Sequence, residues 1–391
     1  MKPMTYAASG VNYDEMDPFK RAAQTAGRAT ASNIARLSGG EFKEYESSRG
    51  ESAYIIEAAK SYFVHVEEGL GTKNLVADKM RELTGRDYYD QIAEDTVAMI
   101  VNDMITVGGL PLSVAMHLAV GDSNWFNDES RSFNLIKGWQ KACSKAGCVW
   151  GGGETPTLKG IVNPGTCVLS GSAMGQVKPK SRLIEAGKII AGDIIILIGS
   201  SGIHANGLTL ARQIAERRDS IWRRIAHFFF PKRYPLKALP KGYLTRLSDG
   251  RTYGESLLDP TLIYVRLVEV CLDRGVDVHY AVNITGHGFR KLMRASQSFK
   301  YVIEHLPKPQ PIFDFIMKHG PVSLKEMYGN YNMGVGFALY VKAEDVQQVL
   351  AVANELGYTA VEAGHIETSQ TRSVALQPLG IEYGEEELQV R

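Results

Sequence analysis

The segment spanning residues 189–216 constrains the fold more than any other part of the chain. It reads IIAGDIIILIGSSGIHANGLTLARQIAE, so a short run of isoleucine and leucine is followed by a glycine-serine turn and then by apolar residues at helical spacing. This order predicts a strand, a tight turn and a helix in quick succession. We expect strands and helices to alternate through YVIEHL and GFALYV up to a helix over 343–358, without the regular repeat that a solenoid needs.

The length of the chain predicts two domains. A chain of 391 residues is too long for one ordinary core, so two units of roughly 150 to 200 residues are expected. A β-rich run, TCVLSGSAMGQV, ends at Val177, and a basic, proline-containing connector follows it. We therefore expect one domain over 1–177 and a second over 178–391.

Charge and hydropathy exclude several classes of protein. Hydrophobic residues make up 44% and charged residues 22% of the chain, with a formal net charge of +1, which excludes wholesale disorder and argues against nucleic acid as a partner. No apolar run approaches the roughly 20 residues that cross a bilayer. The first residues also lack a signal-peptide core, so we expect a cytoplasmic protein without a membrane partner. The scattered cysteines predict structural thiols: Cys143, Cys148, Cys167 and Cys271.

A candidate anion site follows the predicted strand YFVHV. The loop after it contains GLGTK, in which Gly69 and Gly71 let backbone N–H groups approach phosphate oxygens and Lys73 supplies a mobile cation. The alternative is an ordinary turn. A helix predicted over 90–107 carries Glu94, Asp95, Asn102 and Asp103 outside its apolar face. Because Glu68 precedes the loop, Glu68 and Asp103 together with a phosphate cradle are suited to a Mg²⁺-nucleotide.

Three further glycine-rich segments can carry function. A second helix is predicted over 131–146, and GGGETP at 151–156 then interrupts the chain. The turn 199–207 places His204 and Asn206 at a helix start, where the N–H groups favour an anion. His204 is then a donor or acid, or, alternatively, a packed ring beside a capping Asn206. The stretch 327–341 allows either close ligand approach or a tightly packed strand. The usual phosphate-binding motifs of P-loop and Rossmann proteins are missing.

The segment 216–255 departs from the average composition. It holds ten Lys or Arg against four Asp or Glu, and aromatic residues are interleaved with the cations: Trp222, Phe228, Phe229, Phe230, Tyr234, Tyr243 and Tyr253. Such a segment can suit nucleic acid, an anionic ligand or a partner surface. The favoured interpretation is a long connection that packs its aromatic residues on the domain and leaves its cations in solvent.

Eight segments in this order resemble the phosphoribosylformylglycinamidine cyclo-ligase family, which is also called aminoimidazole ribonucleotide synthetase and is PurM-like. They are YAASGVNYD, EGLGTK, DTVAMIVNDMITVGGLPL, GCVWGGGETP, GSSGIHANGLTLAR, DPTLIYV, ITGHGF and EMYGNYNMGVG. The resemblance implies an α+β fold of two domains, with a homodimer formed through the amino-terminal sheet domain. It also implies an ATP and Mg²⁺ site. The implied reaction is ATP-dependent cyclisation of formylglycinamidine ribonucleotide to aminoimidazole ribonucleotide, with release of ADP and phosphate.

The resemblance also implies roles for individual residues. Glu68 and Asp103 correspond to acidic metal or nucleotide ligands, and His204 to a residue that stabilises the transferred phosphate or shuttles a proton. The remaining positions are implied to bind nucleotide (Gly69, Gly71, Thr72, Lys73 and Asn102) or substrate (Glu154, Thr155, Asn206 and Asn332).

The chain departs from the family pattern at several positions. Glu68 stands where the family has Asp, and Gln24 stands where it has a lysine, although Lys20 lies one helical turn earlier. The family's small glycine-rich loop is replaced by the charged segment 38–51, and Leu262 replaces an arginine. Two alternatives therefore stay open. One is a PurM-like paralogue that uses ATP to phosphorylate or activate another small molecule, and the other is a non-catalytic nucleotide-binding subunit.

Overall fold

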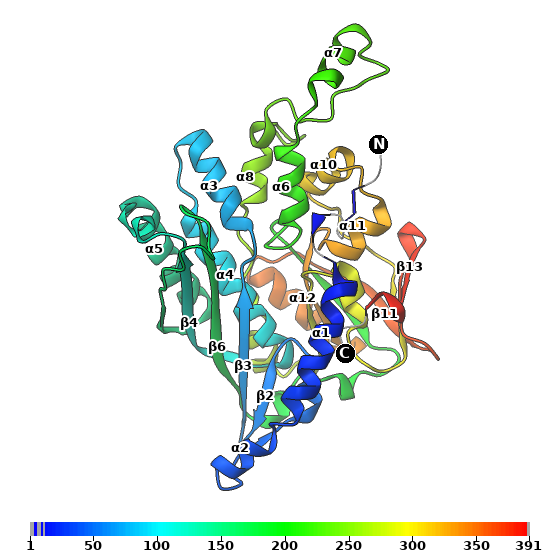
Figure 1. Ribbon diagram of the computed structural model, residues 1–391. Coiled ribbons are helices and arrows are strands. Elements are labelled where there is room, and N and C mark those ends of the chain that lie inside the picture. The colour runs from blue at the N-terminus through cyan, green and yellow to red at the C-terminus, as the bar shows by residue number, and fades with distance from the viewer. Residues whose placement is uncertain (1–3, 6–8, 11, 389–391) are drawn as a thin grey trace.

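The computed structural model describes residues 4–5, 9–10 and 12–388, and it contains two mixed sheets with helices around them (Figure 1). The first motif, YAASGVNYD, lies partly outside the described residues. Among the described residues, none of the helices combines the length and apolar character that crossing a bilayer requires.

The first sheet has six strands in the order β1-β2-β3-β6-β4-β5. The pairs are antiparallel except for β4 with β5. Its elements are α1 (Tyr13–Arg28), α2 (Ser32–Leu37), β1 (Lys43–Glu44), β2 (Tyr54–Glu57), β3 (Tyr62–Gly69), α3 (Lys73–Thr84), α4 (Tyr89–Met104), β4 (Leu110–Val120), α5 (Glu129–Ala146), β5 (Val149–Glu154) and β6 (Cys167–Val177).

The second sheet has seven strands in the order β13-β12-β9-β11-β7-β10-β8. Its elements are β7 (Ile194–Gly199), α6 (Leu208–Glu216), α7 (Ile221–Phe229), α8 (Tyr253–Leu257), α9 (Val265–Asp273), β8 (Val278–Asn283), β9 (Phe299–Ile303), α10 (Pro311–His319), α11 (Leu324–Asn330), β10 (Val335–Val341), α12 (Val346–Glu355), β11 (Ala360–Thr368), β12 (Ser373–Leu376) and β13 (Ile381–Gly384). The predicted strand, turn and helix of 189–216 are thus β7 and α6.

One face of the first sheet is covered and the other is open. Helix α4 packs across β3, β6 and β4, and α5 packs against α4. Strand β6 alternates strictly, with its odd-numbered residues buried toward the helices and its even-numbered residues more exposed. Two apolar side chains on the open face, Val168 and Met174, are each about half exposed. A sheet with one uncovered face that carries exposed apolar side chains is suited to contact another surface.

Three of the four polar residues predicted to lie outside the apolar face of α4, namely Asp95, Asn102 and Asp103, are buried, whereas Glu94 is only partly buried. Asp95 accepts hydrogen bonds from the backbone N–H and the hydroxyl of Thr261, at 2.8 and 2.6 Å. Asn102 accepts from the N–H of Tyr264 at 2.9 Å. Helix α4 therefore lies between the first sheet and the second half of the chain, and Thr261 and Tyr264, which bind its polar side, are more than 150 positions away in the sequence.

The segment GGGETP does not interrupt the chain as predicted. Residues 149–154 form β5, an edge strand that pairs in parallel with β4. The strand has no buried side chain along its length, so the alternation that identifies most strands in a sequence is absent. Position 153 requires glycine, because a Cβ there would lie 2.2 Å from the carbonyl oxygen of Met116.

The prediction for the segment 216–255 is wrong in part. Tyr243 and Tyr253 are buried, as expected, but α7 projects away from the body of the protein (Figure 1). Trp222 and Phe228 are each 81% exposed. Most of the aromatic residues in this segment therefore lie in solvent instead of packing on the domain.

Candidate functional site

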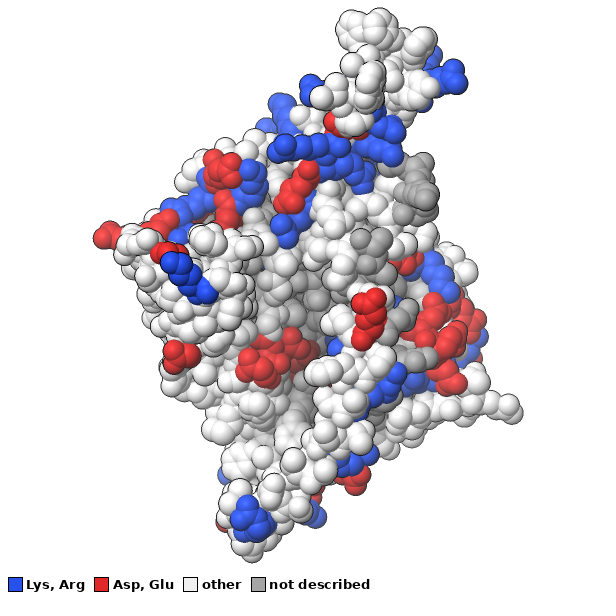
Figure 2. Space-filling view, viewed as in Figure 1, with Lys and Arg blue, Asp and Glu red and all other residues white. Residues whose placement is uncertain are grey.

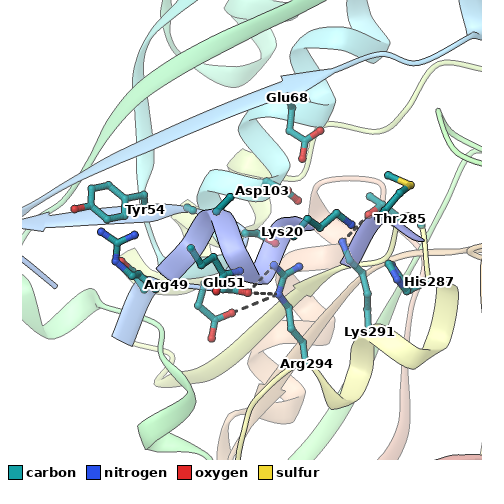
Figure 3. Close-up of a pocket in the computed structure, with 18 of the residues that line it drawn as sticks. Lys20, Arg49, Glu51, Tyr54, Glu68, Asp103, Thr285, His287, Lys291 and Arg294 are labelled. Carbon is teal, nitrogen blue, oxygen red and sulfur yellow. Dashed lines mark hydrogen bonds and ion pairs between the residues drawn. The ribbon is translucent and has the colours of Figure 1, made fainter. Parts of the chain in front are cut away.

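A cavity of about 770 Å³ lies where the two halves of the chain meet, and Figure 3 shows its charged side chains converging from several elements. Residues of α1, of the 48–54 segment, of β3 and of α4 form one side. Residues 285–294, which follow β8, form the other side, and Asn206 from the turn before α6 also reaches the cavity. The cavity therefore depends on both halves of the chain.

Two of the three acidic residues that line this cavity, Glu68 and Asp103, come from different elements and form a pair. Glu68 lies at the end of β3, and Asp103 lies in the last turn of α4. Asp103 is buried and accepts a hydrogen bond from Asn283 Nδ2 at 2.7 Å. Burial, together with the negative charge of Asp103, raises the pKa of Glu68 to about 8. Burial and mutual repulsion oppose the ionisation of these two close carboxylates. A bound cation stabilises their charged forms, so the pair is suited to hold one.

The donor set fits Mg²⁺ held jointly by protein and ligand. Among the described residues there is no group of three or more His, Cys, Asp or Glu side chains that could hold a metal ion alone. Mg²⁺ is commonly bound through one or two carboxylates, with phosphate oxygens and water completing its shell. Glu68 and Asp103 supply those two carboxylates.

The opposite side of the cavity is basic. Lys291 is buried and donates to the carbonyl oxygen of Asn283 at 3.1 Å and to Thr285 Oγ1 at 2.5 Å. Burial lowers the pKa of Lys291 to about 8, although the charge of Asp103 acts against the shift. Arg294 donates to the carbonyl oxygen of Gly50 at 2.8 Å. These contacts fix two cations in the wall of the cavity, and Figure 3 shows Arg294 directed toward Glu51, with which it forms an ion pair at 3.7 Å.

The wall formed by α1 and the 48–54 segment adds further charge. Lys20 and Gln24 both line the cavity, so the lysine one helical turn before Gln24 is at the site. Lys20 Nζ lies 3.0 Å from Asp17. Arg49 is paired with Glu44, and this pair raises the pKa of Arg49. The charged segment 38–51 thus contributes to the cavity where the sequence comparison expects small residues.

The turn 199–207 separates two predicted site residues. Asn206 lines the cavity. His204 is buried behind it in a left-handed conformation (φ 59°), and its Nε2 accepts the N–H of Ser201 at 3.3 Å. Burial, assisted by the charge of Lys73, lowers the pKa of His204 to about 3, so the ring is neutral at pH 7. A Cβ at Gly336 would lie 2.6 Å from His204 Cε1, which shows how closely the next strand covers the ring.

Asn332 holds the same turn in place. Its Oδ1 accepts hydrogen bonds from Ser200 Oγ at 3.3 Å and from the N–H of Gly334 at 3.0 Å. Its Nδ2 donates to the carbonyl oxygen of Gly202 at 2.9 Å. The predicted substrate-binding side chain is therefore buried and engaged with the backbone.

Lys73 is not the mobile cation that the sequence predicts. Its side chain is fully buried, and it donates to Asp95 at 2.9 Å, to the carbonyl oxygen of His204 at 3.0 Å and to that of Asp259 at 2.7 Å. An ammonium group has three donors, and all three are used. Gly69 ends β3, and Gly71 and Thr72 lie between it and α3; all three are outside the residues that line the cavity.

The structure places the remaining predicted residues elsewhere. Asn102 is fully buried and donates to the carbonyl oxygen of Leu262 at 2.7 Å, so it joins the two halves instead of facing the cavity. Glu154 and Thr155 are exposed at the end of the edge strand β5.

Four residues that the sequence did not single out also line the cavity: Glu51, His287, Lys291 and Arg294. A signal was present for some of them. ITGHGF contains His287, and the cations that follow at 291 and 294 are three residues apart, which places them on one side of a helical turn.

Comparisons with known proteins agree with this architecture. Residues 50–177 match the family model "AIR synthase related protein, N-terminal domain", and residues 191–377 match the model of the C-terminal domain. Among solved structures, a HypE-HypF complex has a TM-score of 0.57 at 16% identity and covers 87% of this chain and 94% of that chain. AaThiL complexed with AMPPCP and TMP has a TM-score of 0.53 at 13% identity, covering 86% and 90%. At these identities the structures share the fold.

Curated relatives are more similar in sequence. The phosphoribosylformylglycinamidine cyclo-ligase of Carboxydothermus hydrogenoformans is 32% identical over 96% of this chain and 99% of its own length. The enzyme of the same name from Methanocaldococcus jannaschii is 33% identical over 80% of this chain and 81% of its own. With both family models matched in order and two relatives above 30% identity, the chain belongs to the AIR synthase related family, as its eight ordered motifs predict.

Proposed function

We propose that this protein catalyses the ATP-dependent closure of formylglycinamidine ribonucleotide to aminoimidazole ribonucleotide, with release of ADP and phosphate. The observation that carries the proposal is the cavity that Glu68, Asp103, Lys291 and Arg294 line together. Membership in a family whose relatives are named cyclo-ligases supplies the substrate.

The reaction asks for charge neutralisation and alignment more than for a protein nucleophile. The formyl oxygen attacks the γ-phosphorus of ATP, and the bond to the ADP oxygen breaks. The amidine nitrogen then attacks the activated formyl carbon. Phosphate leaves with the former formyl oxygen, and the nitrogen loses a proton as the aromatic ring forms.

Glu68 and Asp103 would hold Mg²⁺, which supplies neutralisation of phosphate charge when bound. The hydrogen bond from Asn283 fixes the orientation of Asp103. The Glu68 carboxyl must lose its proton as the cation binds, because its pKa near 8 keeps it largely protonated at pH 7.

Lys291 and Arg294 are suited to orienting a phosphate group of nucleotide or substrate. Two backbone or hydroxyl acceptors hold the Lys291 ammonium, and the carbonyl oxygen of Gly50 together with the carboxylate of Glu51 holds the Arg294 guanidinium. A cation that is already positioned loses little conformational freedom when it binds an anion. In this arrangement a neutral, buried His204 acts through the turn that carries Asn206, as a positioning residue.

We also propose that the protein works as a homodimer in the cytoplasm. The open face of the first sheet, with half-exposed Val168 and Met174, supports a contact with a second copy. The four cysteines are unpaired thiols, which suits a reducing compartment.

A second candidate is a paralogue that activates a different small molecule with ATP. The charged wall contributed by Arg49 and Glu51 favours it, because this part of the cavity differs from the small loop of the cyclo-ligase pattern. The two candidates share the acidic pair and differ in the acceptor.

The test is ADP release by the purified chain with Mg²⁺-ATP and formylglycinamidine ribonucleotide, with aminoimidazole ribonucleotide measured as product. We expect substrate-dependent ADP release in equal amount to the imidazole product. Glu68→Gln should lower the rate by at least about tenfold. Glu67→Gln is the matched control, since Glu67 is the adjacent, exposed residue on the same strand. ATP binding with no imidazole product would contradict the proposal and favour another acceptor.

A further inference from the structure

An arm formed by residues 217–241 projects from the second half of the chain and carries α7 at its outer end (Figure 1). The base of the arm is anchored. Arg217 donates to the carbonyl oxygen of His319 at 3.1 Å, and Leu239 is buried. The returning chain is held by Asp219, whose carboxylate accepts the N–H groups of Lys237 and Ala238 at 2.9 and 2.8 Å. The arm is therefore an ordered element with a fixed attachment.

Helix α7 presents its apolar side to solvent. Its polar side packs on the returning chain, where Arg223 donates to the carbonyl oxygen of Pro235 at 3.2 Å and His227 Nδ1 lies 3.0 Å from that of Tyr234. The opposite side is exposed and consists of Ile221, Trp222, Ile225, Phe228 and Phe229, with Phe230 directly after the helix. A helix of a globular protein ordinarily turns its apolar stripe inward, so the apolar side of α7 is available to a partner outside the chain.

The charge of the arm is almost entirely positive. Residues 217–241 include eight Lys or Arg and a single acidic residue, Asp219. The carboxylate of Asp219 is buried against the backbone, so no acidic side chain of the arm is exposed. Arg218, Arg224, Lys232 and Arg233 are exposed. Figure 2 shows a largely uncharged outer end above basic side chains around its base.

From this geometry we propose that the arm docks on a bilayer that contains anionic lipids, with the apolar side of α7 entering the headgroup region. Short basic amphipathic helices with Trp and Phe on the apolar side bind in this way. The basic side chains then lie at the level of the headgroup phosphates. The docking is peripheral and separate from the cavity. It places the enzyme at a membrane without changing the reaction in the cavity.

Two other partners suit the arm less well. Single-stranded nucleic acid binds by stacking bases on open aromatic faces, but Ile221 and Ile225 offer no such face, and Phe228 and Phe229 pack edge to face at 5.2 Å. A symmetric contact between two arms would bring eight cations of one copy against those of the other. A bilayer that contains anionic lipids accommodates the aliphatic surface of α7 and also neutralises the positive charge of the arm.

The test is co-sedimentation of the full chain with phosphatidylcholine vesicles that contain or lack phosphatidylglycerol. We expect binding to the anionic vesicles that weakens as salt is raised. Phe228→Ala combined with Phe229→Ala should weaken this binding by at least about tenfold. Phe133→Ala is the matched control, because Phe133 on α5 is 64% exposed and Phe229 is 65% exposed. Turnover of the arm variant should equal that of the unchanged protein.

Trp222 provides a direct probe of insertion. Trp125 and Trp139 are buried, whereas Trp222 is 81% exposed, so a blue shift of fluorescence on anionic vesicles that disappears in Trp222→Phe places the arm in the bilayer. The proposal is overturned if the protein does not sediment with vesicles, or if it binds neutral and anionic vesicles equally. RNA binding or arm-dependent self-association without vesicle binding would likewise overturn it in favour of those partners.

Discussion

Lys73 Nζ lies 2.8 Å from Asp95 Oδ2, and both side chains are completely buried. The pair is not confined to one half of the chain. Lys73 also donates to the carbonyl oxygens of His204 and Asp259, and Asp95 also accepts from Thr261. Lys73 on α3 and Asp95 on α4 are thereby paired with each other and also hydrogen-bonded to the second half of the chain.

Lys73→Met should lower the free energy of unfolding by about 3 to 5 kcal/mol, because it leaves Asp95 buried without its cation. The measurement is equilibrium unfolding in urea. Lys79→Met is the control, since Lys79 forms an exposed pair with Glu82 and its loss should cost less than about 0.5 kcal/mol. Equal losses of unfolding free energy in the two variants would show that the buried pair contributes no more to stability than the exposed pair.

Asp103→Asn should weaken the binding of Mg²⁺-ATP by at least about tenfold while leaving the binding of metal-free ATP nearly unchanged, because it removes one charge from the proposed metal site. Isothermal titration calorimetry with and without Mg²⁺ measures both affinities. The Asn side chain keeps an oxygen that can accept from Asn283, so the fold should persist. An equal change in both affinities would place the carboxylate outside the metal site.

His204 should make the protein less stable in acid. Its pKa is about 3 when folded, against an ordinary value near 6.5, so the unfolded chain binds the extra proton between these values. The stability that the neutral His204 ring contributes is then fully present above about pH 6.5, and this contribution falls by about 1.4 kcal/mol per pH unit below that value. His204→Asn retains a residue that tolerates the left-handed backbone and removes the titrating ring.

Urea unfolding at pH 7 and pH 5 measures this effect. The unchanged protein should lose about 2 kcal/mol more than His204→Asn over this interval. If the two proteins lose the same amount, the ring is protonated in the folded state and its environment is more polar than the contacts indicate.

Val168→Lys combined with Met174→Lys should convert the proposed dimer to monomers, because two charges would enter the apolar contact on the open face of the first sheet. Light scattering after size-exclusion chromatography measures the mass. Ile190→Lys is the control, since Ile190 is as exposed as Met174, at 51% each, and lies in the second half. A monomeric unchanged protein, or a dimer that survives both substitutions, would contradict the proposed contact.

Much of the fold is predictable from local patterns. The apolar spacing of 90–107 and the strand, turn and helix of 189–216 correspond to α4, β7 and α6. The apolar spacing identifies the buried side of α4, however, and does not identify the partners of its polar residues. Apart from Lys73, the partners named here for Asp95, Asn102 and Asp103 (Thr261, Tyr264 and Asn283) are more than 150 positions away, and no local pattern indicates them.

The candidate site is predictable to a smaller extent. Glu68, Asp103 and Asn206 line the cavity, whereas Lys73 and Asn102 have the right residue type for ligand binding and are used between the two halves instead. A buried lysine with three protein acceptors and a lysine awaiting phosphate look the same in a sequence. The outward side of α7 is equally hidden, because amphipathic spacing does not state which side faces the protein.

The polar side of α4 has a consequence for synthesis on the ribosome. When residue 177 has been added, Thr261, Tyr264 and Asn283 do not yet exist, although Asp95, Asn102 and Asp103 will pair with them. At about 5 to 20 residues per second, the delay until Asn283 is made is roughly 5 to 20 s. The nascent first half must wait through that interval with its central helix incompletely covered, so the chain is expected to engage chaperones during translation and to resist being divided into two separately expressed halves.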